Sequence, residues 1–214
     1  MLKIALLGGT FNPIHWGHIR IAKALLRHGK FDHFYFVPCK HPLLDKTAET
    51  TVHARLEMLD IALKPYPEFE IDYTEIVRTT PSYTIETLHT FRQRFGDHAS
   101  LSFVIGGDSF LQLPNWHLSE KLLTLAHCIV VDRPGEQTEF SNVLHDLFIA
   151  HEVQDIQEIM THTCGALYRY CAGVYAISSK DIRKKIMLGE KTSGLLPTKV
   201  RRYIDQHDLY LKIS

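Results

Sequence analysis

Three short runs of the chain, residues 2–7, 101–105 and 128–131, are apolar at nearly every position. Strands with one wet face alternate apolar and polar residues, whereas strands covered on both faces are apolar throughout. Amphipathic segments with helical spacing separate these runs, so each strand is expected to be followed by a helix that packs back onto the sheet. This feature predicts a mainly parallel sheet with helices on both faces.

The remaining chain extends the same alternation of strands and helices. Strands are predicted at residues 3–7, 33–37, 69–72, 101–105, 127–131 and 173–177, and helices at 17–28, 51–63, 83–95, 118–125, 179–187 and from Pro197 to residue 206. The expected fold class is therefore α/β, a Rossmann-like doubly wound sheet.

With 214 residues and 45% hydrophobic content, the chain is long enough for one well-buried core, so a single domain over residues 1–214 is the default expectation. Residues 135–171 break the alternation. Phe140, Val143, Leu144 and Leu147 fall at helical spacing, and the acidic run 152–158 is typical of a loop or an exposed helix. We interpret 135–171 as a helical insertion and residues from about 179 as a C-terminal helical segment.

A glycine-rich stretch, residues 8–18, lies at the first strand-to-helix junction and reads Gly-Gly-Thr-Phe-Asn-Pro-Ile-His-Trp-Gly-His. Gly8 and Gly9 permit a tight turn and close approach of a ligand. His15 and His18 share one face at the first turn of the helix, where free N–H groups favour anions. The simpler alternative is a turn with two surface histidines. A zinc site would need a third ligand, and no such partner is evident.

Residues 177–183 form a second strand-to-helix junction. Ser178 or Ser179 can cap the helix, its free N–H groups form another anion nest, and Arg183 projects one turn further along. Taken alone, this pattern is equally typical of a well-capped helix with an exposed arginine.

The stretch 8–18 resembles the signature Gly-Gly-Thr-Phe-Asp-Pro-x-His-x-Gly-His of the nucleotidylyltransferase superfamily, with Asn12 in place of the usual Asp. The resemblance implies that His15 and His18 contact the triphosphate of a nucleotide. The expected ATP-binding residues within the two motifs are Gly8, Gly9, Thr10, Phe11, Ser178 and Lys180.

The C-terminal junction is similar to a second signature of that superfamily, Ile-Ser-x-Thr-x-x-Arg. Ser178 and Arg183 match it, whereas Lys180 replaces the threonine. A lysine can hold a phosphate as a point charge, so the exchange is compatible with phosphate binding. The resemblance implies that Arg183 acts with the two histidines in catalysis.

Further strings look like the bacterial nicotinate-nucleotide adenylyltransferases: residues 81–88, residues 105–109 followed by Pro-Asn-Trp at 114–116, and residues 195–204. The resemblance implies that Trp116 stacks on a nicotinate ring, that backbone N–H groups of Thr84 and His117 bind its carboxylate, and that Asp108 contacts a ribose hydroxyl. Offset aromatic stacking adds about 1 kcal/mol beyond buried area. The alternative for Trp116 is a core or interface aromatic.

Two loops carry further candidate cations. Arg133 precedes Pro-Gly after a predicted strand, where it is expected either to touch a phosphate or to belong to an ordinary turn. Loop 38–46 has no histidine at the place equivalent to that of the family's Pro-Pro-His-Lys string, so Lys40 or Lys46 would supply positive charge to the substrate.

The charge balance excludes several function classes. Lys+Arg of 24 against Asp+Glu of 24 gives zero net charge, which speaks against bulk nucleic-acid or acidic-membrane binding. No apolar segment approaches the roughly 20 residues of a membrane span, so a cytoplasmic protein is expected. The four cysteines form no Cys-x-x-Cys pair and are expected to be free thiols. The sequence carries no signal for an oligomeric state.

The resemblance implies an enzyme of NAD biosynthesis that joins ATP and nicotinate mononucleotide, releasing pyrophosphate, with Mg²⁺ bound through the ATP phosphates. Such a reaction needs alignment and charge neutralisation rather than a protein nucleophile. The alternatives are nicotinamide mononucleotide or phosphopantetheine as acceptor, or a nucleotide-binding protein with weak or no turnover. The sequence has neither a P-loop motif nor Gly-x-Ser-x-Gly, which argues against a P-loop NTPase and an α/β-hydrolase.

Overall fold

The described residues build one parallel sheet. In this computed structural model, residues 1–40, 50–132, 141–171 and 177–211 are described, and their strands pair in the order β3-β2-β1-β4-β5-β7-β6. Every neighbouring pair is parallel. The strands are β1 (Lys3–Gly9), β2 (His33–Pro38), β3 (Glu70–Ile71), β4 (Ser100–Gly106), β5 (His127–Asp132), β6 (Glu152–Val153) and β7 (Leu167–Cys171).

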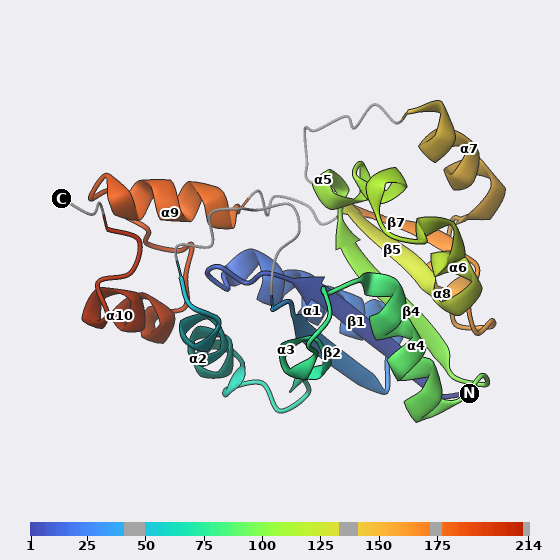
Figure 1. Ribbon diagram of the computed structural model, residues 1–214, viewed down its shortest axis with the longest axis horizontal. Helices are drawn as coiled ribbons and strands as arrows, with labels where there is room; N and C mark the ends of the chain where they lie inside the picture. Colours follow the sequence, from blue (N-terminus) through green and yellow to red (C-terminus); the bar gives the residue numbers. More distant parts are fainter. Residues whose placement is uncertain (41–49, 133–140, 172–176, 212–214) are drawn as a thin grey trace.

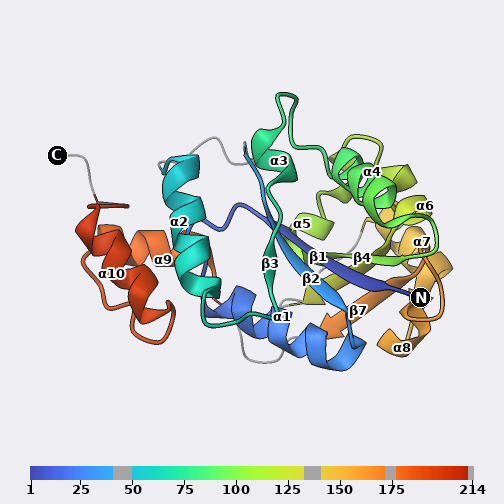
Figure 2. The ribbon, with the colours of Figure 1, turned by 90° about the horizontal axis from the view of Figure 1, so that it is seen from below.

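Helices cover both faces of this sheet, and Figure 2 shows α1 and α4 on opposite sides of it. The longer helices are α1 (Trp16–Gly29), α2 (Val52–Leu63), α4 (Thr84–Phe95), α7 (Asn142–His151), α9 (Ser179–Met187) and α10 (Thr198–Gln206). The short helices are α3 (Thr74–Val77), α5 (Gly107–Phe110), α6 (Leu122–Leu125) and α8 (Ile156–Ile159), with 3-10 turns η1 (Leu113–Asn115) and η2 (Ser119–Lys121).

The core has two layers because side chains of β1 alternate between the faces of the sheet. Leu7 packs with Ile19 of α1 and other residues of α2, α8, α9 and α10, whereas Leu6 packs with Leu88 of α4 and with residues of α6 and α7. Each buried aliphatic side chain of this kind stabilises the fold by about 1.5–3 kcal/mol. The Rossmann-like α/β fold with helices on both faces is thereby confirmed.

The C-terminal helices lie at one end of the molecule. Figure 1 shows α9 and α10 beside α2, away from α4, α6 and α7. Val200 and Ile204 of α10 are fully or almost fully buried in the same core layer as Met58 of α2. The last helical segment is therefore anchored by its apolar stripe, as its spacing predicts.

The segment expected to be a helical insertion also contributes to the sheet. α7 lies where helical spacing places it, but β6 and β7 extend the sheet beyond β5, and Ile156 and Ile159 of α8 are buried. β6 and α8 occupy much of the acidic run for which a loop or exposed helix was expected. The predicted strand 173–177 lies outside the described residues except for Ile177, which is in no strand. β7, at Leu167–Cys171, was not among the predicted strands, and it pairs with β5 along its whole length.

The four cysteines are free, and complete burial raises the pKa of Cys128 to about 12. No helix within the described ranges combines the length and apolarity needed to cross a membrane.

Candidate functional site

A cleft of about 600 Å³ opens at the carboxyl ends of β1, β4 and β5. β1 pairs with β2 on one side and β4 on the other, so the chain reverses its direction of travel across the sheet at this point. Ligands of doubly wound proteins bind at such a switch point. The cleft is lined by Leu7, Gly8, Gly9, Thr10, Phe11, Asn12, His15, Gly17, His18, Ile21, Gly106, Asp108, Ser109, Val131, Asp132, Ile177, Ser178, Ser179, Lys180 and Arg183.

Both sequence motifs border this one cleft. The stretch after β1 supplies its floor and the beginning of α1, and the beginning of α9 supplies the opposite wall. The structure brings together these predicted site residues: Gly8, Gly9, Thr10, Phe11, His15, His18, Asp108, Ser178, Lys180 and Arg183. A cleft with two histidines, a lysine and an arginine, bordered by two helix N-termini, is suited to a polyanion.

The two histidines form a pair at the beginning of α1. Their rings stack with centroids 3.7 Å apart and an interplanar angle of 21°. The backbone N–H of His15 donates to Nδ1 of His18 at 3.3 Å, so a neutral His18 carries its proton on Nε2. A Cβ atom on Gly17 would lie 2.9 Å from the His15 ring. The absence of a side chain at Gly17 therefore leaves room for the His15 ring.

The loop between β1 and α1 contains a strained residue. Phe11 has φ of 47°, in the left-handed region, which costs a non-glycine residue roughly 1–2 kcal/mol. Its ring is buried, with the His18 ring edge-on at 5.2 Å and the Phe36 ring at 5.6 Å. Contacts from outside the loop must hold this conformation.

Helix α9 supplies two of these contacts. Ser179 Oγ donates to the backbone carbonyl of Pro13 at 3.0 Å, and Arg183 donates from Nη1 to the carbonyl of Asn12 at 2.7 Å. Ser178 is the N-cap of the helix and accepts the N–H of Asp181 at 3.4 Å. The two motifs that flank the cleft are thus bonded to each other.

The remaining predicted site residues that the structure describes are not among those that line the cleft. Lys40 donates from Nζ to the carbonyl of Arg78 at 3.0 Å. Trp116 is half-buried, with its ring edge-on to Phe103 at 6.3 Å. Arg133 lies outside the described residues.

Thr84 and His117 lie close to each other through Tyr83, whose ring is 4.5 Å from that of His117. Thr84 is the first residue of α4, so its N–H has no acceptor within the helix. The predicted nicotinate-binding residues therefore gather in a second group, next to α4 and η1, rather than along the cleft. Their role as substrate contacts remains a prediction.

Asp132 is a cleft residue that the sequence reasoning missed. It ends β5, is nearly buried, and accepts a short hydrogen bond from Nε of Arg169 on β7. The ion pair raises the pKa of Arg169. Asp132 precedes the Arg-Pro-Gly string, and its position at a strand end was the available signal.

Arg55 is a second missed residue, and it lies behind the cleft. Its side chain is fully buried and donates to the carbonyls of Thr10 at 2.7 Å and Lys40 at 3.0 Å. Burial lowers the pKa of the guanidinium. The sequence held a signal: Arg55 shares a helical face with the apolar Met58 and Leu59.

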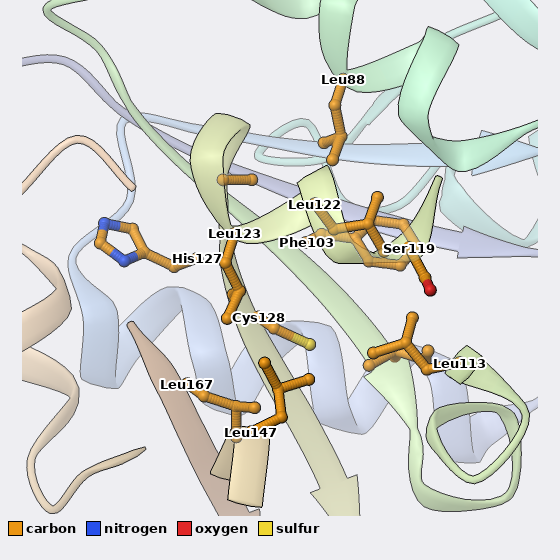
Figure 3. A pocket seen from close by; sticks show the side chains of 12 residues that line it. Leu88, Phe103, Leu113, Ser119, Leu122, Leu123, His127, Cys128, Leu147 and Leu167 are labelled. Atoms are coloured by element: carbon orange, nitrogen blue, oxygen red, sulfur yellow. The ribbon is translucent and has the colours of Figure 1, made fainter. Parts of the chain in front are cut away.

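A separate cavity of about 20 Å³ lies between β4, β5 and the helices of the other core layer (Figure 3). Leucine side chains dominate its lining, whereas the His127 ring points away from them. The cavity holds at most one water molecule. It is too small and apolar for a substrate, so the larger cleft is the candidate site.

His127 is nevertheless unusual. Its Nε2 lies 3.0 Å from the carbonyl of His162, and its Nδ1 accepts the N–H of Ala166 at 3.0 Å. Desolvation lowers the pKa of His127 from 6.5 to about 4. The His127 ring is a neutral structural group at the first residue of β5.

No group of three or more His, Cys, Asp or Glu side chains in the described parts of the chain could hold a metal ion.

Comparisons with known proteins agree with this geometry. A family model described as cytidylyltransferase-like matches residues 6–185. A probable nicotinate-nucleotide adenylyltransferase of Legionella pneumophila is 39% identical over 211 residues, covering 98% of this chain and 100% of the relative. One of Yersinia pestis is 37% identical over 207 residues, covering 96% and 94%.

Solved structures show the same fold. A Plasmodium falciparum nicotinic acid mononucleotide adenylyltransferase complexed with NaAD gives a TM-score of 0.75 at 17% identity, with 98% of both chains covered. The same protein complexed with APC gives 0.73 at 17% identity and the same coverage.

Proposed function

The chain belongs to the cytidylyltransferase-like family, together with nicotinate-nucleotide adenylyltransferases, and we propose that it transfers the adenylyl group of ATP to nicotinate mononucleotide. The products are the deamido dinucleotide and pyrophosphate, a step of NAD biosynthesis. The observation that carries this proposal is that both phosphate-type motifs border one cleft at the switch point of the sheet.

The reaction is an in-line displacement at phosphorus. A phosphate oxygen of the mononucleotide forms a bond to the α-phosphorus of ATP, the bond between that phosphorus and the bridging oxygen breaks, and the electron pair leaves with pyrophosphate. The attacking oxygen is already an anion, so the protein need only align the reactants and neutralise charge. His15, His18, Lys180 and Arg183 would supply that neutralisation along the walls of the cleft.

His18 is placed to donate a hydrogen bond to a phosphate oxygen. Its Nδ1 accepts a backbone N–H, so the neutral ring carries its proton on Nε2. The N-terminus of α1 adds its partial positive charge at the same place. Asp108, at the beginning of α5, also lines the cleft, where its carboxylate can accept a hydrogen bond from a ribose hydroxyl.

Mg²⁺ fits this cleft as a companion of ATP. The described residues offer no cluster that could hold the ion alone, and Mg²⁺ prefers phosphate oxygens with one or two carboxylates and water. Among the described residues that line the cleft, Asp108 is the exposed carboxylate. When bound, the ion would offset charge on the triphosphate.

The acceptor site would be the second group around Thr84, Trp116 and His117. A half-buried tryptophan beside a helix N-terminus suits a flat aromatic carboxylate, because the ring can stack and the free N–H can donate. A carboxamide would lose the charge-assisted part of that contact.

One assay tests the proposal. The protein is incubated with Mg²⁺, ATP and each of nicotinate mononucleotide, nicotinamide mononucleotide and phosphopantetheine, and pyrophosphate release is measured. We expect the nicotinate acceptor to give the highest kcat/KM. A higher kcat/KM with another acceptor would identify that compound as the substrate. ATP binding without pyrophosphate release from any of the three mixtures would support a nucleotide-binding protein instead.

A matched pair of variants ties the activity to the cleft. We expect His18→Ala to abolish turnover. His98→Ala changes an exposed histidine just before β4, at the end of that strand away from the cleft, and should leave turnover unchanged. Equal rates for both variants would remove the histidine pair from the mechanism.

A further inference from the structure

Side chains from three distant parts of the chain hold the loop between β1 and α1 (residues 10–13). The loop contains the left-handed Phe11 and forms part of the cleft. Its backbone carbonyls and its Asn12 side chain accept hydrogen bonds from Arg55, Ser179, Arg183 and Tyr210.

Tyr210 is the most distant of these in the sequence. Its hydroxyl donates to Oδ1 of Asn12 at 2.6 Å, across 198 residues of chain. The tyrosine is 6% exposed and Asn12 is 1% exposed, so water does not compete for this bond. The end of the chain, beyond α10, therefore reaches the loop that lines the cleft.

The Asn12 amide is held through only one of its two ends. Oδ1 accepts the tyrosine hydroxyl, whereas Nδ2 is buried and bonds to no group in the described part of the chain. Loss of the tyrosine hydroxyl would therefore leave both ends of this buried amide without a partner. The bond to Tyr210 is the contact that fixes the orientation of the Asn12 side chain within the loop.

We propose that Tyr210 is a positioning residue for the nucleotide site, acting through Asn12 to hold residues 10–13 in the conformation that receives the ATP phosphates. This inference rests on the proposed function for the identity of the nucleotide. Tyr210 does not line the cleft, so we assign its effect to the loop that its hydroxyl contacts at Asn12.

The test compares Tyr210→Phe with a matched control, Tyr203→Phe. Tyr203 is a half-buried tyrosine of α10 whose ring lies 4.2 Å from that of His207. ATP affinity is measured by calorimetry, kinetics are measured with ATP and mononucleotide varied separately, and the melting temperature is followed for each variant.

We expect Tyr210→Phe to weaken ATP binding about five- to twentyfold, the factor that loss of one buried hydrogen bond typically gives. The KM for mononucleotide should stay within about twofold, because its predicted site lies elsewhere. Tyr203→Phe should change neither constant. A purely structural role would instead lower the melting temperature of Tyr210→Phe and leave the ratio of the two KM values unchanged.

A double-mutant cycle with Asn12→Ala tests the route. If Tyr210 acts through Asn12, adding Tyr210→Phe to Asn12→Ala has no further effect on ATP affinity. Multiplying effects would overturn the inference, as would an unchanged ATP affinity in Tyr210→Phe.

The same data separate this inference from the proposed function. Wild-type turnover with an unaffected Tyr210→Phe variant would overturn only the positioning role. ATP binding that weakens in Tyr210→Phe, with no pyrophosphate from the wild type, would overturn only the proposed reaction. Wild-type protein that binds no ATP would overturn both.

Discussion

Arg183 on α9 donates a hydrogen bond to the backbone carbonyl of Asn12, with 2.7 Å between Nη1 and the oxygen. These residues belong to the two motifs in which the chain departs from its superfamily, at Asn12 and Lys180. Asn12 is engaged on two sides, by Arg183 at its backbone and by Tyr210 at its side chain. Lys180 is exposed at the edge of the cleft. The departures therefore lie in different environments.

Arg183→Lys should lower kcat/KM for ATP about 10- to 100-fold. A lysine keeps the charge but cannot reproduce the planar fork that reaches the Asn12 carbonyl beside the cleft, and a lost charge-assisted bond costs roughly 1.5–3 kcal/mol. Steady-state kinetics with ATP varied measures the effect. Arg202→Lys, an exposed arginine of α10, is the control and should behave as wild type; an active Arg183→Lys would show that charge alone suffices.

Gly17→Ala should reduce turnover at least tenfold without destabilising the fold. The added Cβ would lie 2.9 Å from the His15 ring and displace it, while alanine in a helix is about 0.5–1 kcal/mol more favourable than glycine. Turnover and thermal melting are measured on the same preparation. Full activity in this variant would mean that the stacked position of His15 is not required.

Arg55→Met should destabilise the protein by roughly 3 kcal/mol. The change leaves the buried carbonyls of Thr10 and Lys40 without their donor, and an unsatisfied buried acceptor costs about 1–3 kcal/mol. Urea unfolding gives the difference. Arg27→Met, at an exposed position of α1, should stay within about 0.5 kcal/mol, and an equally small loss for Arg55→Met would contradict the structural role.

His127 should make the fold sensitive to mild acid. The ring has a pKa of about 4 in the folded protein against 6.5 ordinarily, so the unfolded chain binds more protons between these values. The stabilisation is complete above pH 6.5 and is lost as pH falls toward 4, by on the order of 3 kcal/mol. His127→Gln should be less stable at pH 7.5 but show a flatter profile in urea unfolding from pH 7.5 to 4.5. Parallel profiles for the two proteins would assign the acid sensitivity to other groups.

Local patterns predict most of the secondary structure because its causes are local. α9 begins and ends at the predicted residues, and each end of α1, α2 and α4 lies within one residue of its predicted position. Neither β6 nor β7 was predicted. β6 has two residues, too few to show a periodic pattern, and Leu167 of β7 is identified as a strand residue by its pairing with β5. α3 and α5 are single turns that follow strand ends and leave too short a pattern to be recognised.

Local sequence patterns are sufficient to predict the parallel α/β fold and the two anion-binding motifs, because apolar runs, caps and glycines act over a few residues. Which distant side chains hold those motifs depends on tertiary packing. Arg55 and Tyr210 reach the loop at residues 10–13 because the sheet order and the packing of α10 on α2 bring them behind it. Trp116 and Thr84 are not among the residues that line the cleft, although the resemblance assigned both to the substrate. Such contacts depend on how all the elements pack together, and no short stretch of sequence encodes that arrangement.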